Sequence, residues 1–201
     1  EATAAERKKR IRLGVSPHAP YTVSAPLFVA VHQFAKKEGL PVCIHVGESV
    51  AERQWLQDGT GPIAHSYRER GIPWIPPRTT PVQYLHNLGV IEEFTLLVHC
   101  IHLEEKDCEI IRTQKAAVAH CPKSNWKLGH GYMNLKEIHR RGIRLGLGTD
   151  SVASNNSMDF FEEMRLTRSN PTVCVPPSNN DTDLQRDALL SSAELLRMGT
   201  L

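Results

Sequence analysis

Short apolar runs alternate along this chain with stretches whose apolar residues recur at helical spacing. The apolar runs are bounded by turn signals, as is typical of strands buried on both faces, and they cover residues 11–16, 42–46, 94–99, 116–120 and 143–148. Helical patterns cover residues 24–37, 50–58, 65–70, 82–88, 104–113, 135–141, 158–168 and 183–198, with loops at 73–81 and 172–182. This alternation predicts an α/β fold of parallel β-α-β units with right-handed crossovers.

Residues with metal-binding or acid–base chemistry stand at the ends of most predicted strands. His45 and Glu48 close the second run, His99 ends the third, His120 ends the fourth and Asp150 follows the fifth. An open, doubly wound sheet collects its functional groups at one switch point, whereas a β/α barrel presents them at the carboxyl ends of many strands. The placement therefore favours consecutive strands of a barrel, with the open sheet as the alternative.

The overall composition argues against two classes of partner, nucleic acids and membranes. The 24 basic and 22 acidic residues leave a net charge of +2, so there is no electrostatic case for a nucleic-acid partner. No apolar stretch approaches the roughly 20 residues that cross a bilayer, so no membrane partner is expected. The five cysteines are odd in number and form no C-x-x-C pair, and no signal peptide opens the sequence. This pattern predicts free thiols and a cytoplasmic location.

Some of the ten histidines are better candidates for chemistry than others. His45 stands three residues before Glu48, so an imidazole and a carboxylate meet at one strand end, as metal-assisted proton transfer requires. His18 lies between two prolines in a stiff loop, which suits substrate binding. Asp150 has two candidate roles, as a metal ligand and as the N-cap of the following segment. His120, which is followed by Cys-Pro, is expected to be structural. Structural roles are also expected for His32, His65, His86, His102, His130 and His139.

Five motifs in order resemble the amidohydrolase superfamily, in its branch of hydrolytic deaminases and chlorohydrolases. The segments that carry the resemblance are S-P-H-A-P-Y-T (16–22), H-V-G-E-S (45–49), H-C-I-H-L (99–103), A-H-C-P-K-S-N (119–125) and L-G-T-D-S (147–151). Each is weak alone, but together they cover nearly the whole chain with the family's spacing. The resemblance implies one divalent metal, Zn²⁺ or Fe²⁺, because imidazole with carboxylate accepts both.

The resemblance also implies a role for each site residue. His45 and Asp150 would be metal ligands, and Asp150 also belongs to the catalytic group. Glu48 would be the catalytic proton shuttle, and His99 would orient or deprotonate the attacking water. His18 and Asn125 would contact the substrate, with Asn125 in the pocket wall.

The implied reaction is hydrolytic removal of ammonia from an aromatic amidine-like ring of the purine or nucleoside class. Hydroxide attacks the ring carbon while Glu48 protonates the neighbouring nitrogen. Two alternatives stay open. Dechlorination of a triazine-like ring uses the same attack with chloride leaving, and a non-catalytic remnant would keep the fold without the metal. An open-sheet nucleotide-binding domain is disfavoured, because no glycine-rich phosphate loop follows the first predicted strand.

One departure from the family pattern shapes the domain prediction. The family holds its metal partly with an H-x-H pair, and no H-x-H occurs in these 201 residues, so two expected ligands are missing. We therefore expect residues 1–201 to form a single partial barrel domain. It would comprise about strands 4 to 8 of a (β/α)8 barrel, without the first strands and the β-sandwich, and would be inactive or weak alone. The expected partners are a small-molecule substrate and, by family analogy, a second copy in a homodimer.

Overall fold

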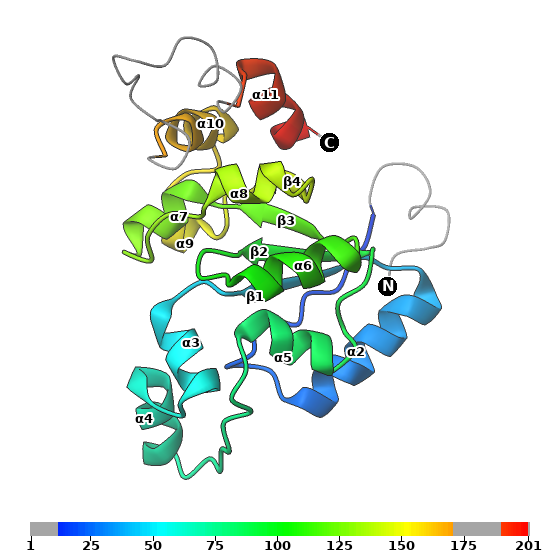
Figure 1. Ribbon diagram of the computed structural model, residues 1–201, viewed down its shortest axis with the longest axis vertical. Helices are drawn as coiled ribbons and strands as arrows, with labels where there is room; N and C mark the ends of the chain where they lie inside the picture. The colour runs from blue at the N-terminus through cyan, green and yellow to red at the C-terminus, as the bar shows by residue number, and fades with distance from the viewer. Residues whose placement is uncertain (1–11, 171–189, 201) are drawn as a thin grey trace.

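Figure 1 shows the computed structural model, which describes residues 12–170 and 190–200. Its described part contains one parallel sheet of four strands in the order β1-β2-β3-β4. The strands are β1 (Val42–Val46), β2 (Thr95–His99), β3 (Ala117–His120) and β4 (Arg144–Leu147). Beside β1, Val15 makes a single parallel bridge to Val42. Four predicted strands are thus confirmed, whereas residues 12–16 form only this bridge and residue 11 lies outside the described residues.

The helices connect the strands in the predicted alternation. They are α2 (Ala25–Glu38), α3 (Val50–Gln57), α4 (Gly61–Glu69), α5 (Pro81–Asn87), α6 (Glu105–Thr113), α7 (Pro122–Lys127), α8 (Leu135–Arg140), α9 (Val152–Asn155), α10 (Phe160–Arg168) and α11 (Ser192–Thr200). The predicted turn at 65–70 belongs to a longer helix, α4. The start of the predicted last helix and the 172–182 loop lie outside the described residues. The short helices α7 and α9 were not predicted, because four to six residues are too few to show a periodic pattern.

The strand order distinguishes the two architectures that the sequence left open. Each strand pairs with the next one along the chain, and every pairing is parallel. With right-handed crossovers, an unbroken sequential order brings the connecting helices to one face of the sheet. Across the described strands there is therefore no point where the order reverses, as a doubly wound sheet would require. This sequential parallel order is the one that consecutive strands of a barrel have.

Both faces of the sheet are apolar, as the continuous runs predicted. Ile44, Leu97 and Val118 are fully buried in the larger core cluster with the helices. A smaller cluster contains Val98 and Ala119, which alternate with the first set along the strands. Because both faces of the sheet pack against apolar side chains, the polar side chains that can bind a metal or transfer protons are confined to the strand ends and the loops that follow them.

Two local signals start helices beside those ends. The Ser49 side chain accepts the backbone N–H of Glu52 at 3.2 Å and so begins α3 directly after Glu48. Pro122 stands at the first turn of α7, where its missing N–H leaves no intrahelical bond unmade. In the part of the chain that the structure describes, no helix combines the length and apolarity needed to cross a membrane.

Candidate active site

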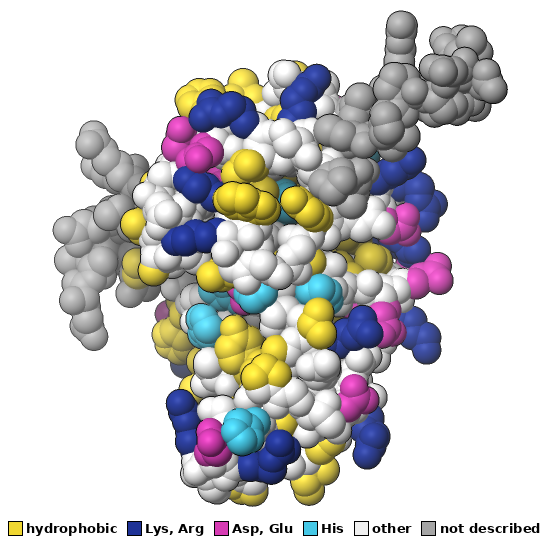
Figure 2. All heavy atoms as spheres, turned by 90° about the vertical axis from the view of Figure 1, so that its left-hand side faces the viewer, with side chains coloured by type: hydrophobic (Ala, Val, Ile, Leu, Met, Phe, Trp, Pro, Cys, Tyr) yellow, Lys and Arg dark blue, Asp and Glu magenta, His cyan; other side chains and the backbone are white. Residues whose placement is uncertain are grey.

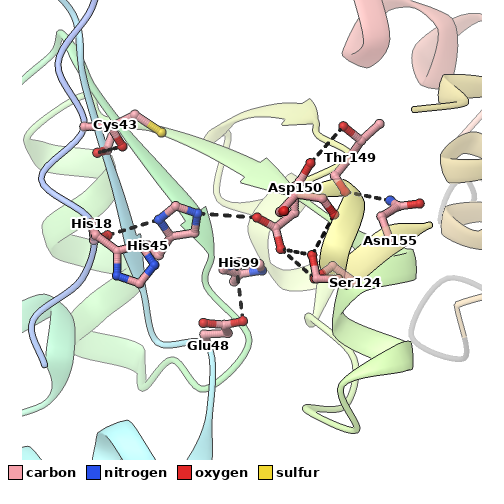
Figure 3. Close-up of polar contacts among 12 residues, drawn as sticks. His18, Cys43, His45, Glu48, His99, Ser124, Thr149, Asp150 and Asn155 are labelled. Carbon is pink, nitrogen blue, oxygen red and sulfur yellow. Dashed lines mark hydrogen bonds and ion pairs between the residues drawn. The ribbon is translucent and has the colours of Figure 1, made fainter. Parts of the chain in front are cut away.

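Three side chains from three different strands converge at the carboxyl end of the sheet. His45 lies near the end of β1, His99 is the last residue of β2, and Asp150 follows β4. One potential ligand atom from each lies within 4.8 Å of the other two. Figure 3 shows the three side chains directed toward one another, and Figure 2, seen from this end, shows histidines gathered across the middle of the surface.

The two imidazoles are oriented by acceptors behind them. His45 Nδ1 lies 3.0 Å from the backbone oxygen of His18, and His99 Nδ1 lies 2.8 Å from Asn125 Oδ1. Both of those oxygens only accept, so each Nδ1 carries the hydrogen. The Nε2 atoms of His45 and His99 are then left with free lone pairs facing the centre of the site. This is the arrangement by which hydrogen bonds prepare histidine as a metal ligand.

Asp150 is oriented in the same way by two hydroxyl groups. Ser124 Oγ donates to Asp150 Oδ2 at 2.7 Å, and Ser154 Oγ donates to the same oxygen at 2.5 Å. Oδ1 faces His45 Nε2 at 3.6 Å. Burial alone would raise the pKa of Asp150, but the adjacent His45 imidazole and the hydrogen bonds from Ser154 and Ser124 outweigh it and hold this pKa well below its usual range. Asp150 is therefore an anion at neutral pH.

The backbone at this rim adopts conformations that side chains other than glycine seldom take. The φ angles of His99, Cys100 and Asp150 are 74°, 47° and 56°, and that of Gly47 is 62°. The strand ends are tied together, because the N–H of Cys100 donates to Val46 at 3.0 Å and the next two N–H groups donate to Gly47 at 2.9 Å. Left-handed residues cost about 1–3 kcal/mol each and gather where the surrounding structure holds a functional geometry.

The donor set fits a divalent cation. His99 is fully buried, yet within the described residues its Nε2 has no hydrogen-bond partner, and its 3.5 Å contact with Glu48 Oε1 is not a hydrogen bond. An unpaired buried nitrogen aimed at a second imidazole and a carboxylate is accounted for by a cation held among them. Two imidazole nitrogens and one carboxylate oxygen suit Zn²⁺ or Fe²⁺. The sequence expectation assigned His45 and Asp150 to the metal and His99 to water; the geometry adds His99 as a third potential ligand.

Glu48 lies beside this cluster in a mostly buried position. Its Oε1 is 3.5 Å from Nε2 of both His99 and His130, and its Oε2 accepts a long 3.4 Å hydrogen bond from the Tyr21 hydroxyl. Burial, and next the charge of Glu48, raise the pKa of Tyr21, so its hydroxyl stays protonated. Glu48 thus accepts one hydrogen bond, from Tyr21, and its other oxygen faces the same centre as the potential ligands.

The residues expected to bind substrate lie at different depths. His18 is exposed, its Nδ1 contacts Thr22 Oγ1 at 2.8 Å, and its ring centroid is 4.9 Å from that of His45. Burial, and next the charge of His45, lower the pKa of His18. Asn125 is fully buried behind His99, and its Nδ2 has no hydrogen-bond partner among residues 12–170 and 190–200. The structure therefore brings His18 to the mouth of the site and Asn125 to its floor.

Sequence reasoning missed several contacts around the site. His130 was assigned a structural role, because G-H-G (129–131) carries no pattern that places it beside Glu48. Tyr21 and Ser124 stand inside the motifs that carried the resemblance, so their positions in those motifs were an available signal. His120, expected to be structural, is fully buried, and burial lowers its pKa to about 3.

Comparisons with known proteins identify a family and several relatives of this chain. The model of the amidohydrolase family matches residues 1–201. A 5-methylthioadenosine/S-adenosylhomocysteine deaminase from Pelotomaculum thermopropionicum is 40% identical over 156 residues, covering 78% of this chain and 32% of that relative. The chain thus spans about a third of the length of the curated relatives it matches.

Solved structures extend the comparison. An adenosine deaminase from Xanthomonas campestris with bound zinc matches with a TM-score of 0.70 and 29% identity, over 92% of this chain and 36% of that one. An atrazine chlorohydrolase from Arthrobacter aurescens matches with a TM-score of 0.70 and 22% identity, over 92% and 35%. The second likeness is evidence for the fold alone.

Proposed function

This chain belongs to the amidohydrolase family, and from that premise we propose that it carries the metal-binding centre of a hydrolase that deaminates the purine ring of a nucleoside. The observation that carries the proposal is the convergence of His45, His99 and Asp150, with Glu48 beside them. The substrate class follows the names of the related deaminases. The reaction adds water at the ring carbon bearing the amino group, breaks the C–N bond and releases ammonia.

We assign the metal to His45 and Asp150, with His99 as a third ligand or as the residue that orients the attacking water. When bound, Zn²⁺ or Fe²⁺ would supply a Lewis acid that makes hydroxide available near neutral pH. The hydrogen bonds behind these side chains support the assignment, because they leave the metal-facing atoms free and remove rotational freedom before any ligand arrives.

Glu48 is the proposed proton carrier. The Tyr21 hydroxyl donates to Oε2 of this carboxylate and leaves Oε1 facing the ligand cluster, where it accepts a proton from water and delivers it to a ring nitrogen within hydrogen-bond reach. The exposed imidazole of His18 next to His45 suits contact with the polar part of a nucleoside. Asn125 acts in this proposal mainly through His99, whose N–H it accepts.

For the fold, we propose that the Val15 bridge and the four strands of the sheet correspond to about strands 4 to 8 of a (β/α)8 barrel. The sequential parallel order supports this, and so does the match to about a third of a longer solved chain. A barrel would bring the ligands of its earlier strands to the same rim. Dechlorination is the weaker proposal, because its structural likeness is at 22% identity.

The test is an ammonia-release assay on the Zn²⁺-loaded chain with adenosine, 5-methylthioadenosine and S-adenosylhomocysteine. Because two expected ligands are missing from these 201 residues, we expect weak ammonia release, which Glu48→Gln lowers to background with Zn²⁺ affinity unchanged. The matched control is Glu38→Gln, which changes an exposed glutamate at the end of α2. Chloride release from a chlorotriazine without ammonia release, or ammonia release that ignores Glu48→Gln, would overturn the proposal.

A further inference from the structure

A second carboxylate, remote from the reacting centre, connects several parts of the site. Glu163 lies on α10, and its side chain is fully buried. Its Oε1 accepts Asn155 Nδ2 at 2.6 Å, and its Oε2 accepts the backbone N–H of Lys123 at 3.1 Å. Both oxygens therefore receive a donor, each from a segment that carries residues of the site.

The first contact leads to Asp150. Asn155 is also fully buried, and its Nδ2 donates a second hydrogen bond, of 2.6 Å, to the backbone oxygen of Thr149. Thr149 immediately precedes Asp150, which has the left-handed φ of 56°. The loop after β4 can hold this conformation because Asn155 bridges it to Glu163, as Figure 3 shows for Thr149 and Asn155.

The second contact leads to the other ligands. Lys123 is followed by Ser124, which donates to Asp150 Oδ2, and by Asn125, which accepts the N–H of His99. By holding the Lys123 backbone, Glu163 sets where the first turn of α7 begins relative to the loop after β4. One carboxylate thus bridges the two segments that orient Asp150 and His99.

We propose that Glu163 is a positioning residue that holds Asp150 and the Ser124–Asn125 pair in one fixed relation, so that the metal-facing atoms are preorganised. The expected effect on metal binding rests on the proposed function, whereas the two hydrogen bonds of Glu163 do not depend on it. A buried carboxylate is costly unless each oxygen is bonded, and a hydrophobic residue of similar size would pack there without that cost. The contacts of Glu163 are to site-bearing segments, which argues for positioning over packing.

Glu162 offers a matched control one residue away. It is partly exposed and also binds Lys123, but through the ammonium group, at 2.5 Å from Lys123 Nζ. Glu163→Gln keeps the volume of the side chain while presenting an NH₂ group to one of its two donors. Glu162→Gln changes the same helix, and its own contacts, with Lys123 Nζ and the Ser157 hydroxyl, differ from the two hydrogen bonds of Glu163.

The first experiment is hydrogen exchange, followed by mass spectrometry, on the metal-free chain. Glu163→Gln is expected to speed exchange about tenfold or more in segments 121–127 and 149–156 while leaving 42–48 unchanged. Glu162→Gln is expected to leave all three segments unchanged. An equal rise in all three segments for Glu163→Gln would indicate general destabilisation and overturn the proposal, as would equal effects of the two variants.

The second experiment measures Zn²⁺ affinity by competition with a chelator. Glu163→Gln is expected to weaken binding about tenfold or more, and Glu162→Gln to leave it unchanged. The double variant Glu163→Gln with Asn155→Ala should weaken Zn²⁺ binding by less than the combined effects of the two single variants, because the two residues act through one contact. Affinity unchanged by Glu163→Gln overturns the proposal. A wild-type chain that binds no Zn²⁺ would instead contradict the proposed function, and the exchange comparison would still decide the positioning role.

Discussion

The site has two sides that hold their functional groups by different means. On the β1 side, defined by His45, Glu48 and Glu52, the fully buried Glu52 accepts the backbone N–H of Glu48 at 2.9 Å. On the β4 side, defined by Asp150, Asn155 and Glu163, an equally buried glutamate bonds with both oxygens. Glu52 Oε1, by contrast, has no hydrogen-bond partner in the described part of the chain.

The two sides differ in the sequence separation of the residues that form their contacts. Glu52 and Glu48 are four residues apart, so the start of α3 is enough to form their contact. Glu163 and Lys123 are 40 residues apart, and their contact exists only when α7 and α10 pack together. The β1 side is therefore a local structure, whereas the β4 side depends on tertiary packing. Mutations can separate the two.

The largest effect is expected when a ligand is removed from either side. His45→Gln and Asp150→Asn should each weaken Zn²⁺ binding by more than about 100-fold, beyond the range for residues that only support ligands. Competition with a chelator measures this loss. Similar losses on the two sides would show that one cation joins them. Retained affinity in either variant would remove that residue from the metal site.

The next largest effect concerns the pH dependence of stability on the β1 side. Burial raises the pKa of Glu52 from 4.5 to about 8. Glu52 then binds a proton in the folded state that it has lost in the unfolded state between these values, so its contribution to the free energy of unfolding falls as pH rises from 4.5 toward 8. The slope is at most about 1.4 kcal/mol per pH unit.

Glu52→Gln should flatten that slope, whereas the exposed control Glu38→Gln should keep it. Urea unfolding at pH 5, 6, 7 and 8 measures both variants against the wild type. A wild-type slope that Glu52→Gln leaves unchanged would contradict the raised pKa of Glu52.

A smaller effect is expected on the floor of the site. Asn125→Ala removes the acceptor of the His99 N–H, leaving a buried donor unpaired, which costs about 1–3 kcal/mol of unfolding free energy. Urea unfolding at one pH measures it. Asn87→Ala, at an exposed position in α5, serves as the control and should change the value by less than about 0.5 kcal/mol. Equal values for the two variants would mean that the His99–Asn125 bond adds nothing to stability.

The smallest effect is expected for Tyr21→Phe. The 3.4 Å bond from Tyr21 to Glu48 is long, so its loss should lower the rate of ammonia release by less than about tenfold. Steady-state kinetics with a nucleoside substrate measures the change. A fall of more than about 100-fold would mean that the Tyr21 hydroxyl takes part in the reaction, and the β1 side would then need a further catalytic group.

Much of the fold was readable from the chain, because continuous apolar runs and helical spacing are local properties. Strands 42–46, 94–99, 116–120 and 143–148 appear within one residue of their expected bounds. Residues 12–16 did not become a full strand, since Val15 alone meets the geometry of a bridge. The short helices α7 and α9 were not predicted, because Pro122 and Ser151 mark where they begin and no periodic pattern accompanies them.

Local sequence established which side chains stand at strand ends, because the length of a strand and the turn residues that bound it are local properties. It thereby nominated His45, Glu48, His99 and Asp150. Tertiary packing was needed to bring His99 Nε2 toward His45 and Asp150, to place His130 beside Glu48, and to bond Glu163 to Lys123. These relations join residues 40 to 105 positions apart or depend on a side chain's orientation, and neither is specified until the sheet and its helices have packed.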